Sequence, residues 1–373
     1  MNESFRLSRL ILEKLVATDT SNPPGSEQPA AEYLAEFLTA CGFACVMQTI
    51  DAGRVNLIAE LRRGAGPSLL YNGHLDVVPA CGNWNFPPFR LTQRDGKLYG
   101  RGSCDMKSGV AAMCAAAAYM AKTPFSGTLK LLFVADEERG NLGAHTYLQH
   151  YEKSDYTVIG EPTNLHVAVA HRGICRNYVT FFGKAKHAAL VRDAGHSSVL
   201  MAAKAVLALE ELNQNLERRS HPILPSPSVA VTQLEGYEGE NIIPARVRLL
   251  TDFRIHPGTT LEEAQETIRK TLQKAGLEDF AVENHFFLPG GQIDEHDPFV
   301  TACCRIAAEI SGQAEAPQAF GASCEQCFFQ GKPTLICGPG SMEQAHTADE
   351  YVQEEQLYRA VEFYIRLAQT ILK

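Results

Sequence analysis

The sequence has no long apolar run, no excess of basic residues and no low-complexity tract. No segment approaches the ~20 uninterrupted apolar residues that a membrane-spanning helix requires. Lys and Arg number 34 against 43 for Asp and Glu, a formal net charge of −9, whereas proteins that bind nucleic acids more often carry a basic face. We therefore expect neither a membrane nor a nucleic acid as a partner.

Two further absences concern the cellular compartment. The first residues, Met1 to Arg6, lack the basic-then-apolar order of a signal peptide. The 11 cysteines are an odd number, irregularly spaced, in a chain too large to depend on disulfide bonds. We expect a cytoplasmic protein with reduced thiols.

The 373 residues are 45% hydrophobic and 21% charged, a composition typical of a folded globular protein. Short apolar runs flanked by Gly, Asp or Pro predict buried strands, and segments of helical period or Ala-rich composition predict helices between them. Because strands alternate with helices, the sequence predicts the α/β class. In the first part of the chain the predicted helices cover 7–16, 30–39 and 106–121, and the predicted strands cover 56–61, 69–71, 129–135 and 156–159.

A second texture begins near Val167 and ends near Gly291. Its pattern predicts the order strand, helix, strand, strand, helix, strand, with strands over 178–182, 229–234 and 246–255 and helices over 197–218 and 261–274. The first texture then returns, with a helix over 298–311, a strand over 334–337 and a helix over 354–372. We predict a discontinuous larger domain, 1–172 and 288–373, interrupted by an inserted two-layer α+β domain, 173–287.

Carboxylates and histidines gather where the predicted strands end, which is where open α/β sheets bind ligands. Two imidazoles and several carboxylates at one sheet edge offer the nitrogen and oxygen ligands that divalent ions take, zinc first among them. Taken singly, each residue has an ordinary structural explanation, such as a turn or a solvated strand end. Taken together they predict a metal centre. The residues are His74, Asp76, Asp105, Glu137, Glu138, Glu161 and His346.

Five short motifs carry a resemblance to a known family. They are Gly73–Pro79, Tyr99–Gly109, Asp136–Glu138, Gly160–Pro162 and Ala345–Thr347. In order and spacing the chain resembles, over nearly its whole length, the acetylornithine deacetylase and succinyl-diaminopimelate desuccinylase family of co-catalytic zinc amidohydrolases. The resemblance implies a zinc-exopeptidase-like, three-layer catalytic domain with a mixed, mainly parallel sheet, and an inserted lid and dimerisation domain.

The resemblance also implies a set of metal ligands. Asp105 is expected to bridge two divalent ions, zinc or alternatively cobalt or manganese. His74 and Glu161 are expected to complete one site, and Glu138 and His346 the other.

Two further acids receive roles from the resemblance. Asp76 is expected to orient His74 and fix its tautomer through the ring nitrogen that does not bind metal. Glu137 is left outside the ligand set as the general base, which takes a proton from the attacking water and returns it to the leaving amine.

The insert is expected to supply residues to the reaction. The spacing Gly183-x-x-x-His187 matches a lid histidine that steadies the oxyanion in a neighbouring active site of a homodimer, with His196 as a rival. Asn241 and Arg254 match positions that hold a substrate carboxylate, although Arg254 can also be explained as a strand salt bridge.

Ser323–Cys327 lies where family members contact substrate, and we predict that Glu325 does so here. The Cys324-x-x-Cys327 pair can also indicate redox or metal chemistry. That interpretation is weaker, because the sequence has no second such pair and no thioredoxin-like context.

The resemblance is strongest to the acetylornithine branch of the family. It predicts hydrolysis of N2-acetyl-L-ornithine to L-ornithine and acetate, a step of arginine biosynthesis. The alternatives are succinyl-diaminopimelate or another N-acyl amino acid or dipeptide, and, from other classes, a non-catalytic metal-binding protein or a thiol-redox protein.

Overall fold

The computed structural model describes residues 2–190 and 196–373. The chain forms two compact units, the first made of Met1–Val169 and Gln292–Lys373, the second of Ala170–Gly291. The insert predicted from the sequence, 173–287, falls wholly within the second unit.

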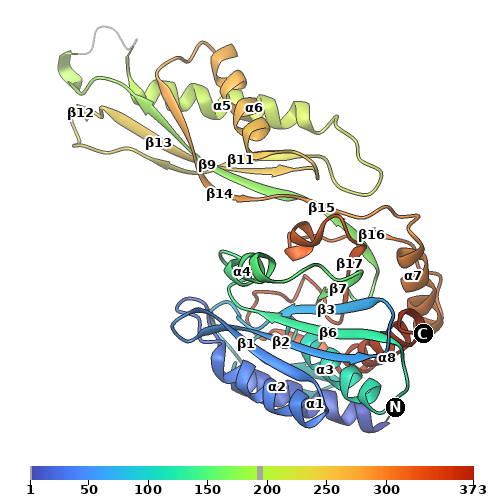
Figure 1. Ribbon diagram of the computed structural model, residues 1–373. Helices are drawn as coiled ribbons and strands as arrows, with labels where there is room; N and C mark the ends of the chain where they lie inside the picture. The colour runs from blue at the N-terminus through green and yellow to red at the C-terminus, as the bar shows by residue number, and fades with distance from the viewer. Residues whose placement is uncertain (1, 191–195) are drawn as a thin grey trace. The chain divides into compact units, whose positions relative to one another are not determined.

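The first unit is built on a nine-stranded mixed sheet (Figure 1). Its central strands, in the order β6-β3-β7-β17, run parallel, whereas β1 and β2 are antiparallel at one edge. The predicted α/β class with a mixed, mainly parallel sheet is therefore confirmed. In sheet order the strands are β1 (Ala44–Asp51), β2 (Arg54–Arg63), β6 (Gly127–Val134), β3 (Ser68–His74), β7 (Tyr156–Pro162), β17 (Thr334–Gly338), β8 (Ala168–His171) and β15 (Gly291–Gln292), with β16 (Gln318–Ala319) paired to β8.

Helices cover both faces of this sheet, which gives three layers (Figure 1). One face carries α1 (Asn2–Ala17), α2 (Gln28–Ala40), α3 (Lys107–Ala121) and α8 (Glu354–Ile371), with α7 (Pro298–Ser311) packed on α8. The other carries α4 (Leu142–His150) and the short helix η2 (Glu325–Phe329). A small separate sheet has the order β18 (Tyr351–Gln353), β5 (Lys97–Tyr99), β4 (Thr92–Arg94).

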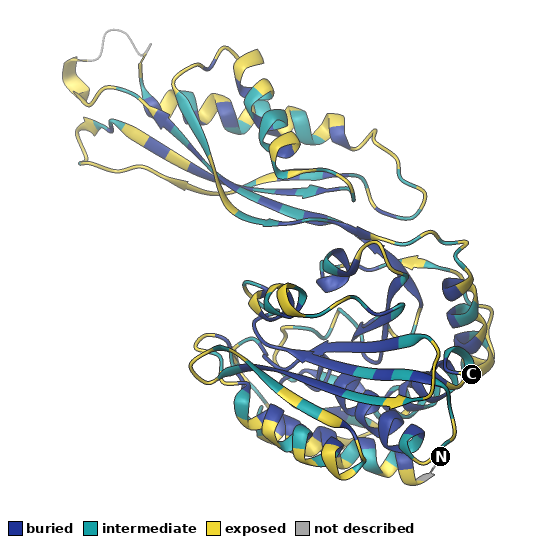
Figure 2. Cartoon of the chain, viewed as in Figure 1, coloured by how far each residue is buried: buried dark blue, intermediate teal, exposed yellow. Residues whose placement is uncertain are grey.

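Both faces of the central strands are buried, which explains their unbroken apolar runs. On β3, Leu70 packs in the same cluster as Tyr147 of α4, whereas the neighbouring Tyr71 donates its hydroxyl to the carbonyl of Tyr364 on α8. The Ala-rich α3 is almost entirely buried, because its small side chains let α1, α2 and α8 pack close around it (Figure 2). No helix in the described part of the chain combines the length and the apolarity needed to cross a bilayer.

The second unit has two layers. Its antiparallel sheet has the order β11 (Ser228–Glu235), β13 (Arg246–Ile255), β9 (Gly173–Phe182), β14 (Phe280–Leu288). Helices α5 (Ser198–Leu216) and α6 (Leu261–Lys274) pack on this sheet around a core of their own. A two-stranded sheet pairs β10 (Lys186–His187) with β12 (Ile242–Ile243), and η1 (Ala188–Leu190) follows β10.

Candidate metal centre

The parallel strands deliver the predicted ligands to one edge of the sheet. His74 is the last residue of β3 and lies in register with Val134, the last residue of β6. Glu161 lies near the end of β7, and His346 lies in the loop that follows β17. Because neighbouring parallel strands end at the same edge, these side chains converge there.

Close backbone packing brings the predicted ligand Asp105 to the same edge. Asp105 directly precedes α3, and the first turn of that helix presses on β7 through Gly109. Gly338, at the end of β17, packs against the same residue of β7. A Cβ atom at either Gly109 or Gly338 would overlap the carbonyl oxygen of Gly160. These contacts hold Asp105 beside Glu161, and neither glycine position could accept a larger residue without displacing the backbone.

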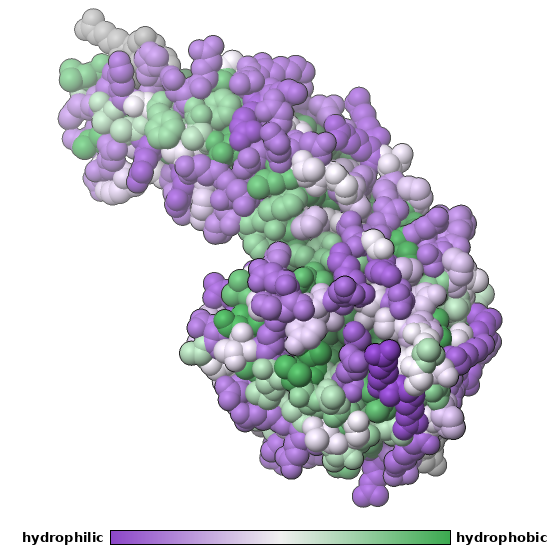
Figure 3. Space-filling model, in the orientation of Figure 1, coloured by the Kyte–Doolittle hydropathy of each residue, from purple (hydrophilic) through white to green (hydrophobic). Residues whose placement is uncertain are grey.

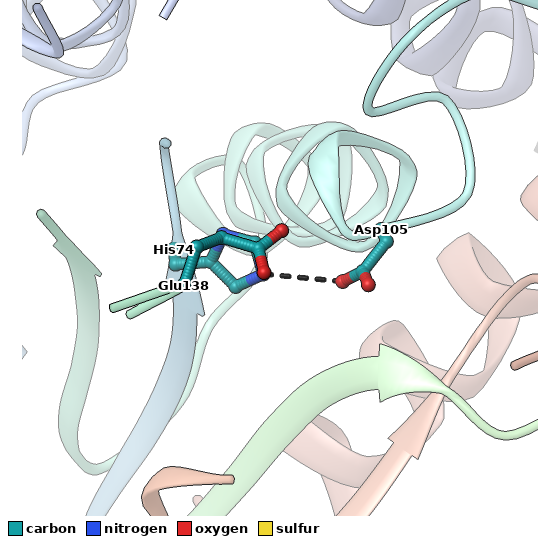
Figure 4. A group of neighbouring side chains, drawn as sticks. All are labelled: His74, Asp105 and Glu138. Atoms are coloured by element: carbon teal, nitrogen blue, oxygen red, sulfur yellow. Dashed lines mark hydrogen bonds and ion pairs between the residues drawn. The ribbon is translucent and has the colours of Figure 1, made fainter. Parts of the chain in front are cut away.

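Asp105 lies between the two predicted imidazoles, with one oxygen toward each. The Nε2 atom of His74 is 3.2 Å from Oδ1 of Asp105 (Figure 4) and 3.7 Å from Oε1 of Glu161. The Nε2 atom of His346 is 3.4 Å from Oδ2 of Asp105 and 2.9 Å from Oε2 of Glu138. The five predicted ligands thus form two overlapping groups that share Asp105.

Burial and neighbouring charges shift the pKa of each of these side chains. Burial raises the pKa of Glu161 well above its usual range, and the charge of Asp105 adds to that effect. Burial opposes protonation of His74, but Asp105 and the other acids outweigh it and raise the pKa of His74. Hydrogen bonds to Asp105 and Glu138 raise the pKa of His346 to about 10. The cluster holds more buried negative charge than its histidines can balance.

A divalent cation fits this arrangement. The Oε1 atom of Glu138 is buried and has no hydrogen-bond partner among the described residues, so one carboxylate oxygen is left for a cation. Within the described chain, His74, Asp105 and Glu138 form one group able to hold a metal ion, and His74, Glu137 and Glu161 form another. Nitrogen and carboxylate oxygen donors of this kind suit zinc and similar divalent ions.

Asp76 orients His74 through its main-chain carbonyl and not through its carboxylate. The Nδ1 of His74 donates to the main-chain carbonyl of Asp76 at 2.8 Å, whereas its distance to the Asp76 carboxylate is 3.7 Å. The carboxylate accepts instead from the backbone N–H groups of Glu137 at 3.1 Å and Glu138 at 3.3 Å. Asp76 therefore fixes both the imidazole and the loop that carries the acids.

Glu137 has the environment that a general base needs. Its carboxylate lies within 4.8 Å of the ligand atoms of His74 and Glu161. Burial raises the pKa of Glu137 well above its usual range, and the nearby acids Glu138 and Glu325 raise it further. A carboxyl whose pKa is raised takes up a proton more readily, which suits a group that must accept one from water.

Sequence reasoning missed a buried network behind this acidic loop. Asn22 donates to Asp76 at 2.9 Å and to Asp136 at 3.0 Å. Arg54 bonds Asp136 at 2.7 Å and Glu27 at 2.6 Å. Since these residues are separated by dozens of positions in the chain, no local motif could have connected them.

Glu325 lies deeper than the sequence suggested. Its side chain is fully buried, and the predicted substrate contact stays a prediction. The side chain is buried because η2 packs inward, and the amide of Asn72 in its hydrogen-bonding orientation donates to Oε2 of Glu325 at 2.8 Å. Burial raises the pKa of Glu325 to about 7.

The two cysteines beside Glu325 show no sign of redox or metal chemistry. Cys324 and Cys327 are both buried free thiols, and burial raises the pKa of each. A thiol with a raised pKa is a poor nucleophile and a poor metal ligand. Neither residue belongs to a metal-binding group among the residues that the structure describes.

In the second unit the structure brings His187 and Asn241 together. Their side chains lie 3.1 Å apart, with Nε2 of His187 facing the Asn241 amide. The backbone N–H of Ala189 donates to Nδ1 of His187 at 3.2 Å, and the Asn241 atom that faces Nε2 is the amide nitrogen Nδ2, so both ring nitrogens lie against donors. The rival His196 is exposed, and its carbonyl accepts from Lys184 at 3.1 Å.

Arg254 is engaged in an ion pair within its own sheet. Its Nε is 2.6 Å from Oδ1 of Asp252, whose other oxygen is 2.8 Å from Arg176. This contact is the strand salt bridge that the sequence analysis gave as an alternative. A third of the surface of the Arg254 side chain is still exposed.

Comparisons with known proteins agree with this geometry. The model of peptidase family M20/M25/M40 matches residues 70–370. An acetylornithine deacetylase of Pasteurella multocida is 32% identical over 348 residues, which cover 88% of this chain and 87% of that protein.

Solved structures show the same fold. An M20 family metallo-carboxypeptidase from Sulfolobus solfataricus superposes with a TM-score of 0.79 at 20% identity, covering 96% of this chain and 98% of that one. A dinuclear metal-binding peptidase of the M20 family from Bacillus subtilis gives 0.75 at 16% identity, covering 100% and 99%. With the family model spanning most of its length, the chain belongs to peptidase family M20/M25/M40 and is a metal-dependent amidohydrolase.

Proposed function

We propose that the protein hydrolyses N2-acetyl-L-ornithine to L-ornithine and acetate, a step of arginine biosynthesis. The observation that carries the chemistry is the placement of Glu137 beside His74 and Glu161, in a cluster where Asp105 lies between His74 and His346. The acetylornithine deacetylase of Pasteurella multocida, similar over most of both chains, supports the choice of substrate. Succinyl-diaminopimelate and other N-acyl amino acids are the competing substrates.

The proposed cofactor is a pair of divalent ions, zinc in the first place. His74 and Glu161 would hold one, Glu138 and His346 the other, and Asp105 would bridge them. A related peptidase of the same fold is described as dinuclear, which supports the number of ions. Ions held in this way supply Lewis-acid polarisation of the acyl carbonyl and a lowered pKa for the attacking water.

The chain's own residues perform the proton transfers. Glu137 takes a proton from the attacking water and later gives it to the leaving amine, which its raised pKa favours. Asp76 keeps Glu137 in place through its backbone N–H and holds His74 in one tautomer. Because these groups are fixed before substrate arrives, little reorganisation accompanies the reaction.

The second unit is proposed to complete the site of another copy of the chain. His187 is proposed to donate from Nε2 to a developing oxyanion, which requires Nε2 to carry a proton and to turn away from Nδ2 of Asn241. Asn241 and Arg254 are proposed to hold the substrate carboxylate, which requires Arg254 to share or leave Asp252.

A homodimer through this unit is part of the same proposal. On the visible face of the unit, hydrophobic residues are interspersed among a majority of hydrophilic ones (Figure 3). Several large apolar residues of the unit are exposed. Contiguous apolar surface is common where subunits associate, and these side chains are the proposed candidates for such a surface. The residues are Phe182, Leu207, Leu234 and Tyr237.

A cytoplasmic location is proposed from the thiols. All 11 cysteines are free, as is usual in a reducing compartment.

The decisive experiment is a hydrolysis panel. Purified protein loaded with zinc or cobalt is tested on N-acetyl and N-succinyl amino acids, with Glu137→Gln as the inactive control. The proposal requires the highest kcat/KM on N2-acetylornithine. A higher value on succinyl-diaminopimelate, or on an acyl amino acid without a basic side chain, would replace that substrate.

A further inference from the structure

Two loops that carry metal ligands meet at one buried carboxylate, that of Glu350. The loop 100–106 carries Asp105, and the loop 339–350 carries His346. Glu350 is fully buried, and no role was assigned to it from the sequence. Its position between the two loops makes it the point where their relative placement is set.

Each oxygen of the Glu350 carboxylate accepts two hydrogen bonds. Oε1 accepts from the backbone N–H of Cys104 at 2.8 Å and of Asp105 at 2.9 Å. Oε2 accepts from the N–H of Gly102 at 2.9 Å and from the guanidinium of Arg101 at 2.5 Å. With both oxygens occupied, Glu350 is a poor candidate for a metal ligand but a strong anchor for the backbone of Asp105.

The main chain joins the same two loops. The carbonyl of Glu350 accepts from the N–H of Gly100 at 2.9 Å and from the hydroxyl of Ser103 at 3.3 Å. The thiol of Cys104 donates to the carbonyl of Ser341 at 3.2 Å. The loop that carries Asp105 is therefore fastened to the loop that carries His346 without help from an ion.

The cost of burying these charges indicates a positional role. Arg101, which pairs with Glu350, is only 2% exposed, and its Nε lacks a hydrogen-bond partner among the described residues. Buried ion pairs of this kind add little net stability over an apolar replacement, although removing one partner is costly. What the pair does provide is a fixed geometry for the three N–H groups that precede α3.

Asp76 gives a precedent in the same site. Its carboxylate holds the N–H groups of Glu137 and Glu138 as Glu350 holds those of Cys104 and Asp105. Each acidic loop of the centre thus has one carboxylate that binds backbone instead of metal.

We propose that Glu350 is a positioning residue of the metal centre, which sets the distance between Asp105 and His346 by binding the backbone of the Asp105 loop. The proposal rests on the two-ion function proposed above. It predicts that changing Glu350 alters metal coordination even in a protein that remains folded.

The test is cobalt titration of the metal-free, full-length protein, followed by visible absorption of the bound ion. Glu350→Gln keeps the side-chain shape but loses the charge that binds four donors. Glu350→Asp keeps the charge but retracts it by one methylene. Both should bind cobalt roughly 10- to 100-fold more weakly, with shifted absorption bands, since partners of the ligands typically contribute that much to affinity.

Ile306→Val is the matched control, because Ile306 is a buried residue of α7, a helix that packs on α8. It should lower the melting temperature without changing cobalt affinity or spectrum. If either folded Glu350 variant binds cobalt with the affinity and spectrum of the unaltered protein, the positioning role is wrong. Failure of the unaltered protein to hydrolyse acetylornithine would refute the proposed substrate, but the cobalt affinity and spectrum would still test Glu350. Binding of a single cobalt ion by the unaltered protein would refute the two-ion centre itself.

Discussion

The two units of the chain hold their functional side chains in opposite ways. In the first unit His74 and Glu161 are buried, and the loops that carry Glu138 and Asp105 are fixed by Asp76 and Glu350 through backbone hydrogen bonds. In the second unit His187 lies exposed on a two-residue strand. The predicted metal ligands are therefore organised within one unit. The proposed substrate contacts depend instead on exposed groups that a partner subunit could still cover.

The largest expected effect lies in the first unit. Glu137→Gln removes the proton acceptor but leaves the ligands in place, so kcat should fall by about 10³- to 10⁴-fold while metal content stays unchanged. Glu343→Gln, an exposed acid on the His346 loop, is the control and should keep full activity. Near-normal turnover by Glu137→Gln would mean that Glu137 is not the general base.

The second unit should affect rate without affecting metal. His187→Ala loses a donor to the oxyanion and should reduce kcat by about 10²- to 10³-fold with both ions retained. His196→Ala is the matched control, since His196 is the rival lid histidine.

Mixing variants then tests where His187 acts. Glu137→Ala and His187→Ala proteins, each nearly inactive, should regain partial activity once their subunits exchange. Exchange without recovery would place His187 at its own chain's site or outside the reaction.

A smaller effect is expected at the predicted carboxylate clamp. Arg254→Gln should raise KM about 10- to 100-fold for substrates with an α-carboxylate, because a charge-assisted hydrogen bond is lost. Arg176→Gln is the control, since Arg176 binds the same Asp252. Equal effects of the two substitutions would mean that both arginines serve only the sheet.

The smallest effect concerns stability after metal removal. Burial raises the pKa of Glu161, and hydrogen bonds to acids raise that of His346, so the folded metal-free protein binds more protons than the unfolded chain. Groups with a raised folded pKa stabilise at low pH, and that stability is lost as pH rises. Since the pKa of His346 is raised to about 10, the melting temperature of chelator-treated protein should fall as the pH rises above 7, by at most about 3 °C per pH unit for this group.

The metal-loaded protein is the control for this pH series and should change less, because the ions replace the protons. Glu161→Gln should reduce the slope of the metal-free protein. A melting temperature that rises with pH in the metal-free form would contradict the assigned shifts.

Periodicity predicted most of the fold. The predicted helices over 261–274 and 298–311 coincide with α6 and α7, because each has a clear cap: a capping box at Thr260 and Glu263, and Asp297 followed by Pro298. Strand β1 and helix α4 were missed. The burial of β1 is irregular along the strand, and α4 is only nine residues long.

The candidate ligands could be picked out from the sequence because they lie in recognisable motifs, most of them at strand ends. Their supports could not, since Asn22, Arg54 and Glu350 act on residues far away in the chain. Backbone conformation was equally hidden. Asp136 and His346 adopt left-handed φ values of 68° and 62°, which sequence patterns assign to glycine.

The unequal exposure of the two imidazoles has a consequence for how ions would come and go. His74 has 1% of its side chain exposed and His346 has 52%. In a two-ion centre of the proposed kind, an ion held by His346 would be more open to solvent and would exchange faster than an ion held by His74. Brief dialysis against a second metal would then replace the ion at His346 first, and the product would be a heterobimetallic enzyme with a defined metal in each position.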